Sequence, residues 1–247
     1  MATTIQSGRS NSPLLTADVA SRAEIFGGRA LNFDGASDYL TGTIGEQYSS
    51  LENFSVSVWT TVDTASDWRR VFTLDNAEVR FGIKSTGKMT FYPNGSTGDI
   101  EFDQSALSTT GGWYHHVITF EKSTTTVKHY LNGALDYTKT NCADAVLDAS
   151  GTYVVGSYTG TSLFWHGKIS DLKLFDATLT EAQAQELYLK PEQSAPSAVK
   201  DNIFLWLPMS EANPKNSQSI VYDHSEKGLG SELASGGSWY EGGVSGL

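Results

Sequence analysis

Aromatic side chains gather in two short stretches that lack the regular pattern of a strand or a helix. The stretch SYTGTSLFWHG holds Tyr, Phe, Trp and His, and a second stretch places a Trp directly before two Arg residues. Sugars stack on flat aromatic rings, and Tyr and Trp anchor many protein interfaces. Filling of a hydrophobic core is the alternative use of such residues in a β-rich protein. The candidate ligand-binding residues are Trp68, Arg69, Tyr158, Phe164, Trp165 and His166.

The usual catalytic patterns are missing or incomplete. Glycoside hydrolysis needs two carboxylates that face the sugar about 5–10 Å apart. Glu101 and Asp103 share one face of an extended segment, where a solvated strand surface explains them. His115 and His116 point to opposite faces of a strand, so they cannot bind one metal ion together. No GxSxG elbow, P-loop or dinucleotide fingerprint precedes a helix, and we therefore expect a protein that is not an enzyme.

Charge and composition argue against several classes of partner. The formal net charge of -11 repels phosphate backbones, and Lys and Arg do not cluster, so we expect no nucleic-acid binding. No run approaches the roughly 18 apolar residues that span a bilayer. The first residues lack a signal-peptide pattern, and the lone Cys142 cannot form an intrachain disulfide. We expect synthesis in a reducing cytoplasm, with neither membrane anchoring nor conventional export.

Alternation of apolar and polar residues predicts strands through most of the chain. In FSVSVWTTV, residues 54, 56 and 58 share one face and residues 55, 57 and 59 the other. Several further stretches repeat this alternation between Gly-, Asn-, Asp- or Ser-containing turns, and Asn132-Gly133 predicts a type I′ hairpin. One helix is expected over residues 180–189, where Thr180 and Gln183 form a capping-box pattern before Pro191. The pattern predicts an all-β protein.

Changes in composition divide the chain into four parts. Residues 1–29 are polar and show no sustained period, which predicts an N-terminal arm. Residues 30–189 contain the alternating stretches and the helix. Residues 190–202 are rich in Pro, Ala and Ser and read as a linker, and residues 203–247 form a C-terminal extension with further strand material.

The ordered motifs resemble the laminin-G-like, concanavalin A-like jelly roll. ALNFDGASDYL, FSVSVWTTV, GGWYHHVITF, VKHYLNGALDY and TYVVGS follow one another within residues 30–189. The closing stretch is the most specific, because it matches the family's final strand and helix in order at Gly167, Asp171, Phe175 and Thr180. The resemblance implies a two-sheet antiparallel jelly-roll sandwich, a fold that hosts lectins, adhesion modules, pentraxins, glycosidases and virion proteins alike.

Two packed sheets bury the inward residues of every strand. The candidate core residues are Phe33, Trp59, Phe72, Phe81, Phe91, Trp113, Val117, Tyr130, Val154, Leu172 and Leu174.

Calcium is the candidate cofactor that the resemblance implies. TLDNAEVRFGI resembles the pentraxin segment in which an Asp-Asn pair binds calcium, which implies that role for Asp75 and Asn76. The partner loop of pentraxins is rich in Glu, Gln and Asp, whereas the matching VGSYTGTSLFWHG has none, so half of the ligand set is missing. A turn at Asp75-Asn76 is the alternative, and turn formation also explains Asp34 and Asp38.

The C-terminal extension carries motifs that usually open this fold. FLWLPMSE, VYDHSEKGLGSEL and GGSWYEGG follow the helix instead of preceding the first strand. Residues 203–209 would fill a vacant position in the sandwich of their own chain, complete a neighbouring subunit, or belong to a truncated repeat. We favour the first arrangement, because a short linker keeps the local concentration of the strand high.

We predict a non-enzymatic virion surface protein of bacteriophage type, such as a capsid decoration, fibre or appendage component. Folds of this kind usually act outside cells, and cell lysis would release into the virion a chain made in the host cytoplasm. Its partners would be other virion subunits or further copies of itself, with a host-surface glycan as an additional partner. The alternative function is a glycan-binding, lectin-like module assisted by calcium.

Overall fold

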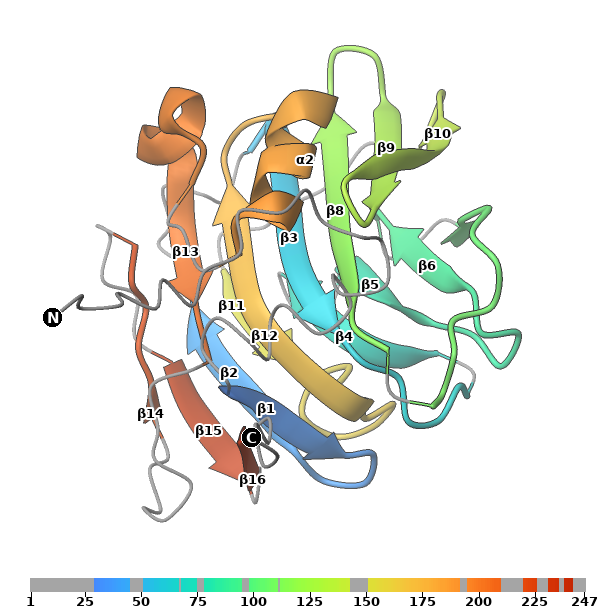
Figure 1. The fold of residues 1–247 in the computed structure, drawn as a ribbon, viewed down its shortest axis with the longest axis vertical. Coiled ribbons are helices and arrows are strands. Elements are labelled where there is room, and N and C mark those ends of the chain that lie inside the picture. The colour runs from blue at the N-terminus through green and yellow to red at the C-terminus, as the bar shows by residue number, and fades with distance from the viewer. Residues whose placement is uncertain are drawn as a thin grey trace, which may run out of the picture.

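Two antiparallel β-sheets pack face to face, and one helix lies on the outer side of one of them (Figure 1). The computed structural model describes residues 29–44, 51–66, 68–74, 78–94, 98–110, 112–142, 151–191, 195–209, 220–225, 231–235 and 238–241. Sheet A faces the viewer in Figure 1 together with the helix α2 (Glu181–Leu189), and sheet B lies behind it. The predicted all-β, two-sheet sandwich with a short helix is confirmed.

Sheet A follows the strand order β10-β9-β8-β3-β12-β1-β16, and β13 also pairs with β12. Its strands are β1 (Arg29–Asp34), β3 (Asn53–Thr60), β8 (Tyr114–Glu121), β9 (Thr126–Leu131), β10 (Ala134–Lys139), β12 (His166–Phe175), β13 (Ile203–Leu207) and β16 (Ser238–Glu241). Asn132 and Gly133 join β9 to β10 with φ values of 51° and 80°, as the predicted type I′ turn requires.

Sheet B follows the order β14-β15-β2-β11-β4-β5-β6-β7. Its strands are β2 (Tyr39–Thr43), β4 (Arg69–Leu74), β5 (Val79–Ile83), β6 (Met89–Tyr92), β7 (Ile100–Glu101), β11 (Thr152–Val155), β14 (Ile220–Val221) and β15 (Ser231–Ser235). Phe72 of β4 pairs with Phe81 of β5, and Phe81 pairs with Phe91 of β6, so this register places one aromatic row on the inner face.

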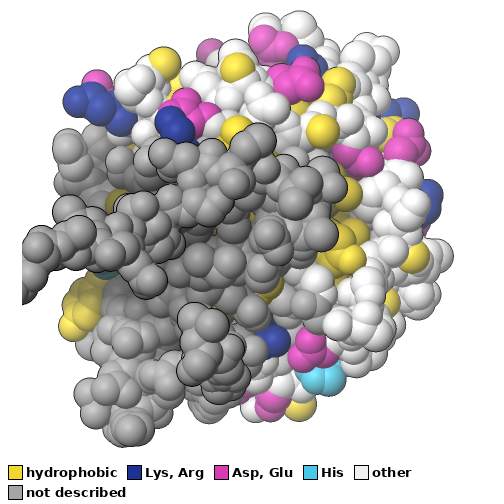
Figure 2. All heavy atoms as spheres, viewed as in Figure 1, with side chains coloured by type: hydrophobic (Ala, Val, Ile, Leu, Met, Phe, Trp, Pro, Cys, Tyr) yellow, Lys and Arg dark blue, Asp and Glu magenta, His cyan; other side chains and the backbone are white. Residues whose placement is uncertain are grey.

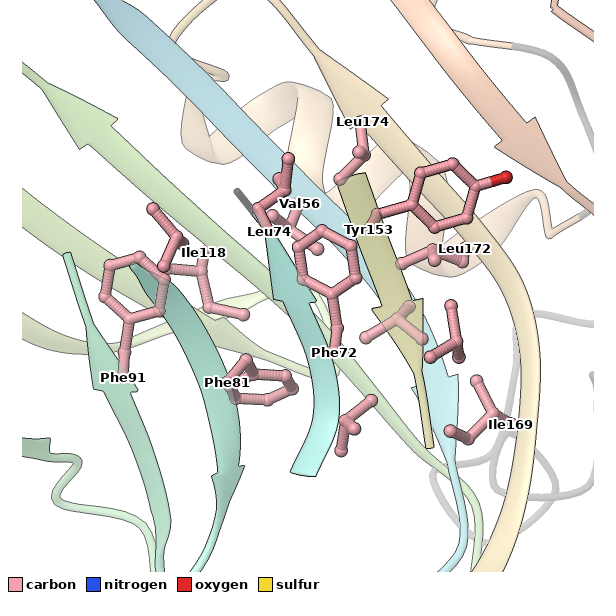
Figure 3. Packing of buried hydrophobic residues seen from close by; sticks show 14 of the residues in the cluster. Val56, Phe72, Leu74, Phe81, Phe91, Ile118, Tyr153, Ile169, Leu172 and Leu174 are labelled. Atoms are coloured by element: carbon pink, nitrogen blue, oxygen red, sulfur yellow. The ribbon is translucent and has the colours of Figure 1, made fainter. Parts of the chain in front are cut away.

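The core lies between the sheets and draws on both (Figure 3). Val56, Ile118 and Leu174 come from sheet A, and Phe72 and Phe91 from sheet B, and all five are fully or almost fully buried. Val154 is an exception to the predicted core, because it is only half-buried on the outer face of sheet B. Its neighbours Tyr153 and Val155 point inward instead, which is the other phase of the same alternation.

A second apolar layer covers the outer face of sheet A. Four predicted core residues, Trp59, Trp113, Val117 and Tyr130, belong to this layer and not to the space between the sheets. The helix α2 supplies the cover, since the Tyr188 ring stacks on Trp59 with ring centroids 5.7 Å apart. Figure 2 shows the molecule from this side, with acidic and basic side chains interspersed over the coloured surface.

The helix begins as the sequence predicted. The Thr180 hydroxyl accepts a hydrogen bond from the Gln183 backbone N–H, and the Gln183 side chain accepts one from the Thr180 backbone, which completes the capping box. Part of the predicted linker is also ordered, because residues 197–202 form a short 3-10 helix whose Val199 packs beneath α2. Within the described part of the chain, neither helix has the length and apolar character needed to cross a membrane.

The C-terminal segment joins the sandwich of its own chain. β1 pairs with residues 166–169 of β12, and β13 continues along the same side of β12 by pairing with residues 172–175. Leu205 and Leu207 of β13 enter the core between the sheets. In this structure β13 pairs with β12 of the same chain. The predicted N-terminal arm, residues 1–29, lies outside the described part of the chain except for Arg29.

Candidate functional site

The outer face of sheet B carries polar and aromatic side chains above the apolar core. Because neighbouring residues of a strand point to opposite sides, the inward Phe81 and Phe91 leave Arg80 and Tyr92 on the outer face, where they pair directly across β5 and β6. Arg70 of β4 pairs with Gly82 of β5 on the same face. Strand alternation and register thus gather side chains that are up to 22 positions apart in the chain.

Aromatic rings and cations alternate across this face, and we call this group the aromatic–cation row: Trp68, Arg70, Arg80, Lys84, Tyr92 and Tyr158. The Arg70 guanidinium lies 5.5 Å from the Trp68 ring centre and 5.1 Å from that of Tyr92. Arg80 lies 5.4 Å from the Tyr92 ring centre and 5.1 Å from that of Tyr158. The Lys84 ammonium lies 4.9 Å from the Trp68 ring centre. These distances are within the range of cation–π attraction.

Arg70 is the most deeply buried cation of the row, with 3% of its surface exposed. Burial lowers its pKa, and the charge of Arg80 acts in the same direction, whereas the Tyr92 hydroxyl opposes the shift. Its Nε and Nη1 atoms have no hydrogen-bond partner among the described residues. The side chain crosses Gly82, where an added Cβ would lie 2.1 Å from the Arg69 carbonyl oxygen and 3.1 Å from the Arg70 Cδ.

Two carboxylates, those of Asp99 and Glu101, lie beside Lys84 at one end of the row. Lys84 forms ion pairs with Asp99 and, at 3.3 Å, with Glu101. Its hydrogen bond to Asp99 raises the pKa of Lys84, although burial opposes this. Glu101 also lies 3.8 Å from Lys88. The carboxylate of Glu101 is therefore engaged by two ammonium groups, which differs from the freely solvated strand face expected from sequence.

The predicted ligand-binding residues separate into three groups. Trp68 and Tyr158 belong to the aromatic–cation row and are half-buried. Arg69 instead ties two loops together, because its Nη1 donates to the carbonyl oxygens of Gly35 at 3.0 Å and Phe164 at 2.5 Å. Half-buried His166 packs beside Gly35 at the start of β12. The Phe164 and His166 side chains remain candidates beside Arg69, outside the aromatic–cation row.

Trp165 corrects the prediction of an exposed ring. It is fully buried and belongs to the core between the sheets. Its backbone N–H donates to the Gly156 carbonyl, which folds the loop back on itself and turns the indole inward. A ligand on the surface cannot reach this ring, so core filling explains Trp165.

The calcium prediction finds little support among the described residues. Asp75 and Asn76 lie outside them. Asp34 caps a turn, because its carboxylate accepts hydrogen bonds from the backbone N–H groups of Ala36, Ser37 and Asp38. Although burial alone would raise the pKa of Asp34, these hydrogen bonds lower it. In the part of the chain that the structure describes, no three His, Cys, Asp or Glu side chains come together in a way that could hold a metal ion.

The two adjacent histidines point to opposite faces of β8, as the sequence predicted, and both are buried. His116 points between the sheets and contacts His129 through ring nitrogens 3.1 Å apart, and His129 contacts the Asp136 carboxylate at 2.8 Å. His115 points to the other side, where its Nε2 lies 2.9 Å from the Ser57 hydroxyl. Burial lowers the pKa of all three histidines, to about 3 for His115.

Sequence reasoning missed Arg70, Arg80 and Tyr92 as site residues. The alternation in VRFGI and MTFY already places Arg80 and Tyr92 on the side opposite Phe81 and Phe91. The missing step was register, since only the strand pairing brings these residues into one row.

The sequence matches the model of a known protein family. A family model described as the concanavalin A-like lectin/glucanases superfamily matches residues 34–185, which is more than half of the chain. No curated protein sequence matches the chain significantly.

Solved structures share the fold at low sequence identity. A protein of Bacteroides ovatus, provisionally named as carbohydrate binding, superposes with a TM-score of 0.68 and 16% identity over 86% of this chain and 59% of its own. A SAP-like pentraxin of Limulus polyphemus gives a TM-score of 0.57 and 15% identity over 83% of this chain and 94% of its own. The chain thus spans about three fifths of the length of the Bacteroides ovatus protein. On the family match, the chain belongs to the concanavalin A-like lectin/glucanases superfamily.

Proposed function

We propose that this protein is a non-enzymatic glycan-binding module and that its ligand lies on the aromatic–cation row. The observation that carries the proposal is the array of aromatic rings interleaved with guanidinium and ammonium groups on the outer face of sheet B. Aromatic rings stack on the C–H faces of sugars, and charged side chains donate hydrogen bonds to sugar oxygens. The provisional naming of the Bacteroides ovatus structure as carbohydrate binding supports the same function.

Binding fits this face better than hydrolysis does. Asp99 and Glu101 are the carboxylates beside the row, and both form ion pairs with Lys84. A general acid must point at the leaving-group oxygen of the substrate, whereas both of these carboxylates are engaged with an ammonium group of the protein.

The virion setting predicted from the sequence is the biological context that we propose for this module. A decoration, fibre or appendage protein that binds a host-surface glycan would serve attachment, and copies of the chain or other virion subunits would be its partners. The genes beside the coding sequence test this context: capsid or tail genes support it, and genes of secretion or sugar metabolism alone would contradict it.

Glycan binding is testable with the full chain on a glycan array, followed by titration calorimetry with the best oligosaccharide. Replacing Trp68 by Ala removes a stacking surface, and a lost aromatic contact of about 1.4 kcal/mol corresponds to tenfold weaker binding. Tyr222→Ala is the matched control, because Tyr222 is an aromatic with 53% exposure that lies after β14 and outside the row. Equal losses in both variants, or binding that neither variant weakens, would contradict the proposed site.

A further inference from the structure

We infer that the glycan bound by the aromatic–cation row is acidic and that its carboxylate or sulfate group pairs with Arg70. This inference rests on the proposed function and deepens it, because it names the chemical class of the ligand. It starts from one side chain whose charge the described part of the protein does not balance.

Arg70 combines deep burial with unused hydrogen-bond donors. Only 3% of its surface is exposed, and neither Nε nor Nη1 meets an acceptor among the described residues. Guanidinium groups carry five donors and stay charged at all ordinary pH values. A buried cation is costly unless an anion or several acceptors compensate it. Folding has thus placed a charge where an oxyanion would be strongly attracted.

The neighbouring cations, Lys84 and Arg80, differ from Arg70 because their charges have partners in the protein. Lys84 is neutralised by Asp99 and Glu101. Arg80 packs against the rings of Tyr92 and Tyr158 and makes a further interaction. Arg80 adds positive potential around Arg70, whereas the two carboxylates offset the charge of Lys84, in a protein whose overall formal charge is -11. Arg70 and Arg80 together favour an anion at this part of the face.

A second unpaired polar group lies in the same cross-strand row. Arg70 pairs with Gly82, and Gly82 pairs with Thr90, so Gly82 separates the two polar side chains. Thr90 is fully buried, and its hydroxyl has no hydrogen-bond partner among the described residues. The Arg70 side chain itself crosses Gly82, where an added Cβ would lie 3.1 Å from the Arg70 Cδ. The two unpaired groups therefore lie in one row across β4, β5 and β6.

Aromatic residues beside Arg70 favour a sugar acid over a simple inorganic anion. Trp68 and Tyr158 are half-buried and lie at opposite ends of the row, with Arg70, Tyr92 and Arg80 between them. A bare sulfate or phosphate ion gains nothing from a flat ring, whereas a sugar ring stacks on it. Rings and guanidinium together thus match a pyranose that carries a negative group.

The test uses an array that holds neutral, uronic-acid and sulfated glycans, followed by calorimetry with galacturonic-acid and galactose trisaccharides and with sodium sulfate alone. We expect the chain to select acidic glycans and to bind them more weakly as salt rises from 50 to 500 mM. Arg70→Met should weaken this binding about 10- to 100-fold, the usual worth of a charge-assisted hydrogen bond. Arg70→Lys should recover part of the affinity.

Matched variants separate the site from general electrostatics and from folding. Lys122→Met removes one exposed positive charge at the β8–β9 turn, far from the row in sequence and on the other sheet, and should leave affinity unchanged. The melting temperature of Arg70→Met should equal or exceed that of the wild type, which shows that lost binding is not lost folding.

The outcomes distinguish this inference from the proposed function. If neutral glycans bind best and Trp68→Ala weakens them while Arg70→Met does not, the acidic-ligand inference fails and the glycan site stands. If sulfate alone binds as tightly as any acidic glycan, the ligand is a simple anion and the sugar part of the inference fails. If no glycan binds, both are wrong. A preference for uronic acids would support a carboxylate as the group that binds Arg70, and a preference for sulfated sugars would support a sulfate group.

Discussion

On the outer face of sheet A the buried Lys173 donates to Asp171 at 2.5 Å, whereas on the outer face of sheet B the buried Arg70 leaves two donors without a partner among the described residues. The sheet A pair is also satisfied from outside the strand, because the Trp206 indole donates to the second Asp171 oxygen at 2.8 Å. Both cations lie beside aromatic rings, yet among the described residues only Lys173 has a carboxylate within hydrogen-bond distance.

The difference indicates which face is structural and which is available for a ligand. The outer face of sheet A is covered by α2, which packs over Trp59, Val117 and Tyr130. The Trp206 ring of β13 lies over the Lys173–Asp171 ion pair on the same face. Sheet B leaves Trp68 and Tyr158 half-buried, with the buried Tyr92 between them in the row. A balanced buried charge stabilises a fold only if it remains paired, while an unbalanced one lowers the cost of binding an anion.

The largest effect is expected from breaking the pair on sheet A. Asp171→Asn removes the negative charge and leaves Lys173 buried alone, which should lower the free energy of unfolding by about 3–5 kcal/mol. The amide also tolerates the φ of 52° found at this position, so backbone strain is not added. Urea unfolding followed by fluorescence measures the change.

A double variant tests whether the charge itself is responsible. Asp171→Asn combined with Lys173→Met removes both charges and should regain much of the lost stability. If the double variant is as unstable as the sum of the single variants, the ion pair is not the cause and the comparison between the faces loses its basis.

A smaller loss is expected when the cover of sheet A is weakened. Leu187 of α2 is 3% exposed and packs in the layer with Val117 and Tyr130. Leu187→Ala should cost about 2–4 kcal/mol because it removes buried methyl groups and leaves a cavity. Glycan binding by this variant should stay at the wild-type level below its melting temperature. A loss of glycan affinity together with the loss of stability would indicate that the ligand binds on sheet A and not on sheet B.

The pH dependence should separate stability from binding. Burial holds the pKa of His115, His116 and His129 below the usual 6.5, so the unfolded chain takes up more protons than the folded one as pH falls below about 6.5. Stability is complete above that pH and should fall by up to about 2 kcal/mol at pH 5 for each histidine that stays neutral. Urea unfolding at pH 8 and pH 5 measures this difference.

Binding should behave differently over the same range, because Arg70 stays protonated throughout. His129→Gln should reduce the pH slope of stability without changing glycan affinity. A slope that is unchanged in this variant would show that other groups control acid unfolding.

The smallest effect on stability is expected in the row itself. Trp68→Ala removes a half-buried ring, and Arg70→Met removes a buried charge that has no carboxylate partner among the described residues. Each should therefore change the free energy of unfolding by less than about 1 kcal/mol. Thermal melts of both variants beside Asp171→Asn test the contrast directly. A loss of 3 kcal/mol or more for Arg70→Met would make Arg70 a structural residue like Lys173.

Local patterns were enough to predict the strands, the Asn132-Gly133 turn and the Thr180 cap. Each depends on neighbouring residues, whose conformations are set by short-range sterics and hydrogen bonds. The inner face was harder to predict where both faces are buried, and so Trp59 was assigned to the core although it lies under α2. Period-two alternation identifies two faces but does not say what covers each one.

The site was predictable only in part, because the pairing register of the strands decides which side chains become neighbours. Trp68 and Tyr158 carry an aromatic signal that the sequence shows, but Arg70 and Tyr92 are joined only through pairing of β4, β5 and β6. Trp165 carried the same signal and is buried, since composition does not reveal which way a loop turns. Burial of a guanidinium with two donors that lack a partner among the described residues is a three-dimensional property that no single-residue pattern contains.

Hydrogen–deuterium exchange of the full chain, with and without the tightest-binding oligosaccharide of the array, tests the location of the ligand most directly. We predict slower exchange in peptides that cover residues 68–74 and 78–92, and unchanged exchange in those that cover residues 181–189 and 203–207. Protection confined to the helix and the strand beside it, with none on sheet B, would contradict the account.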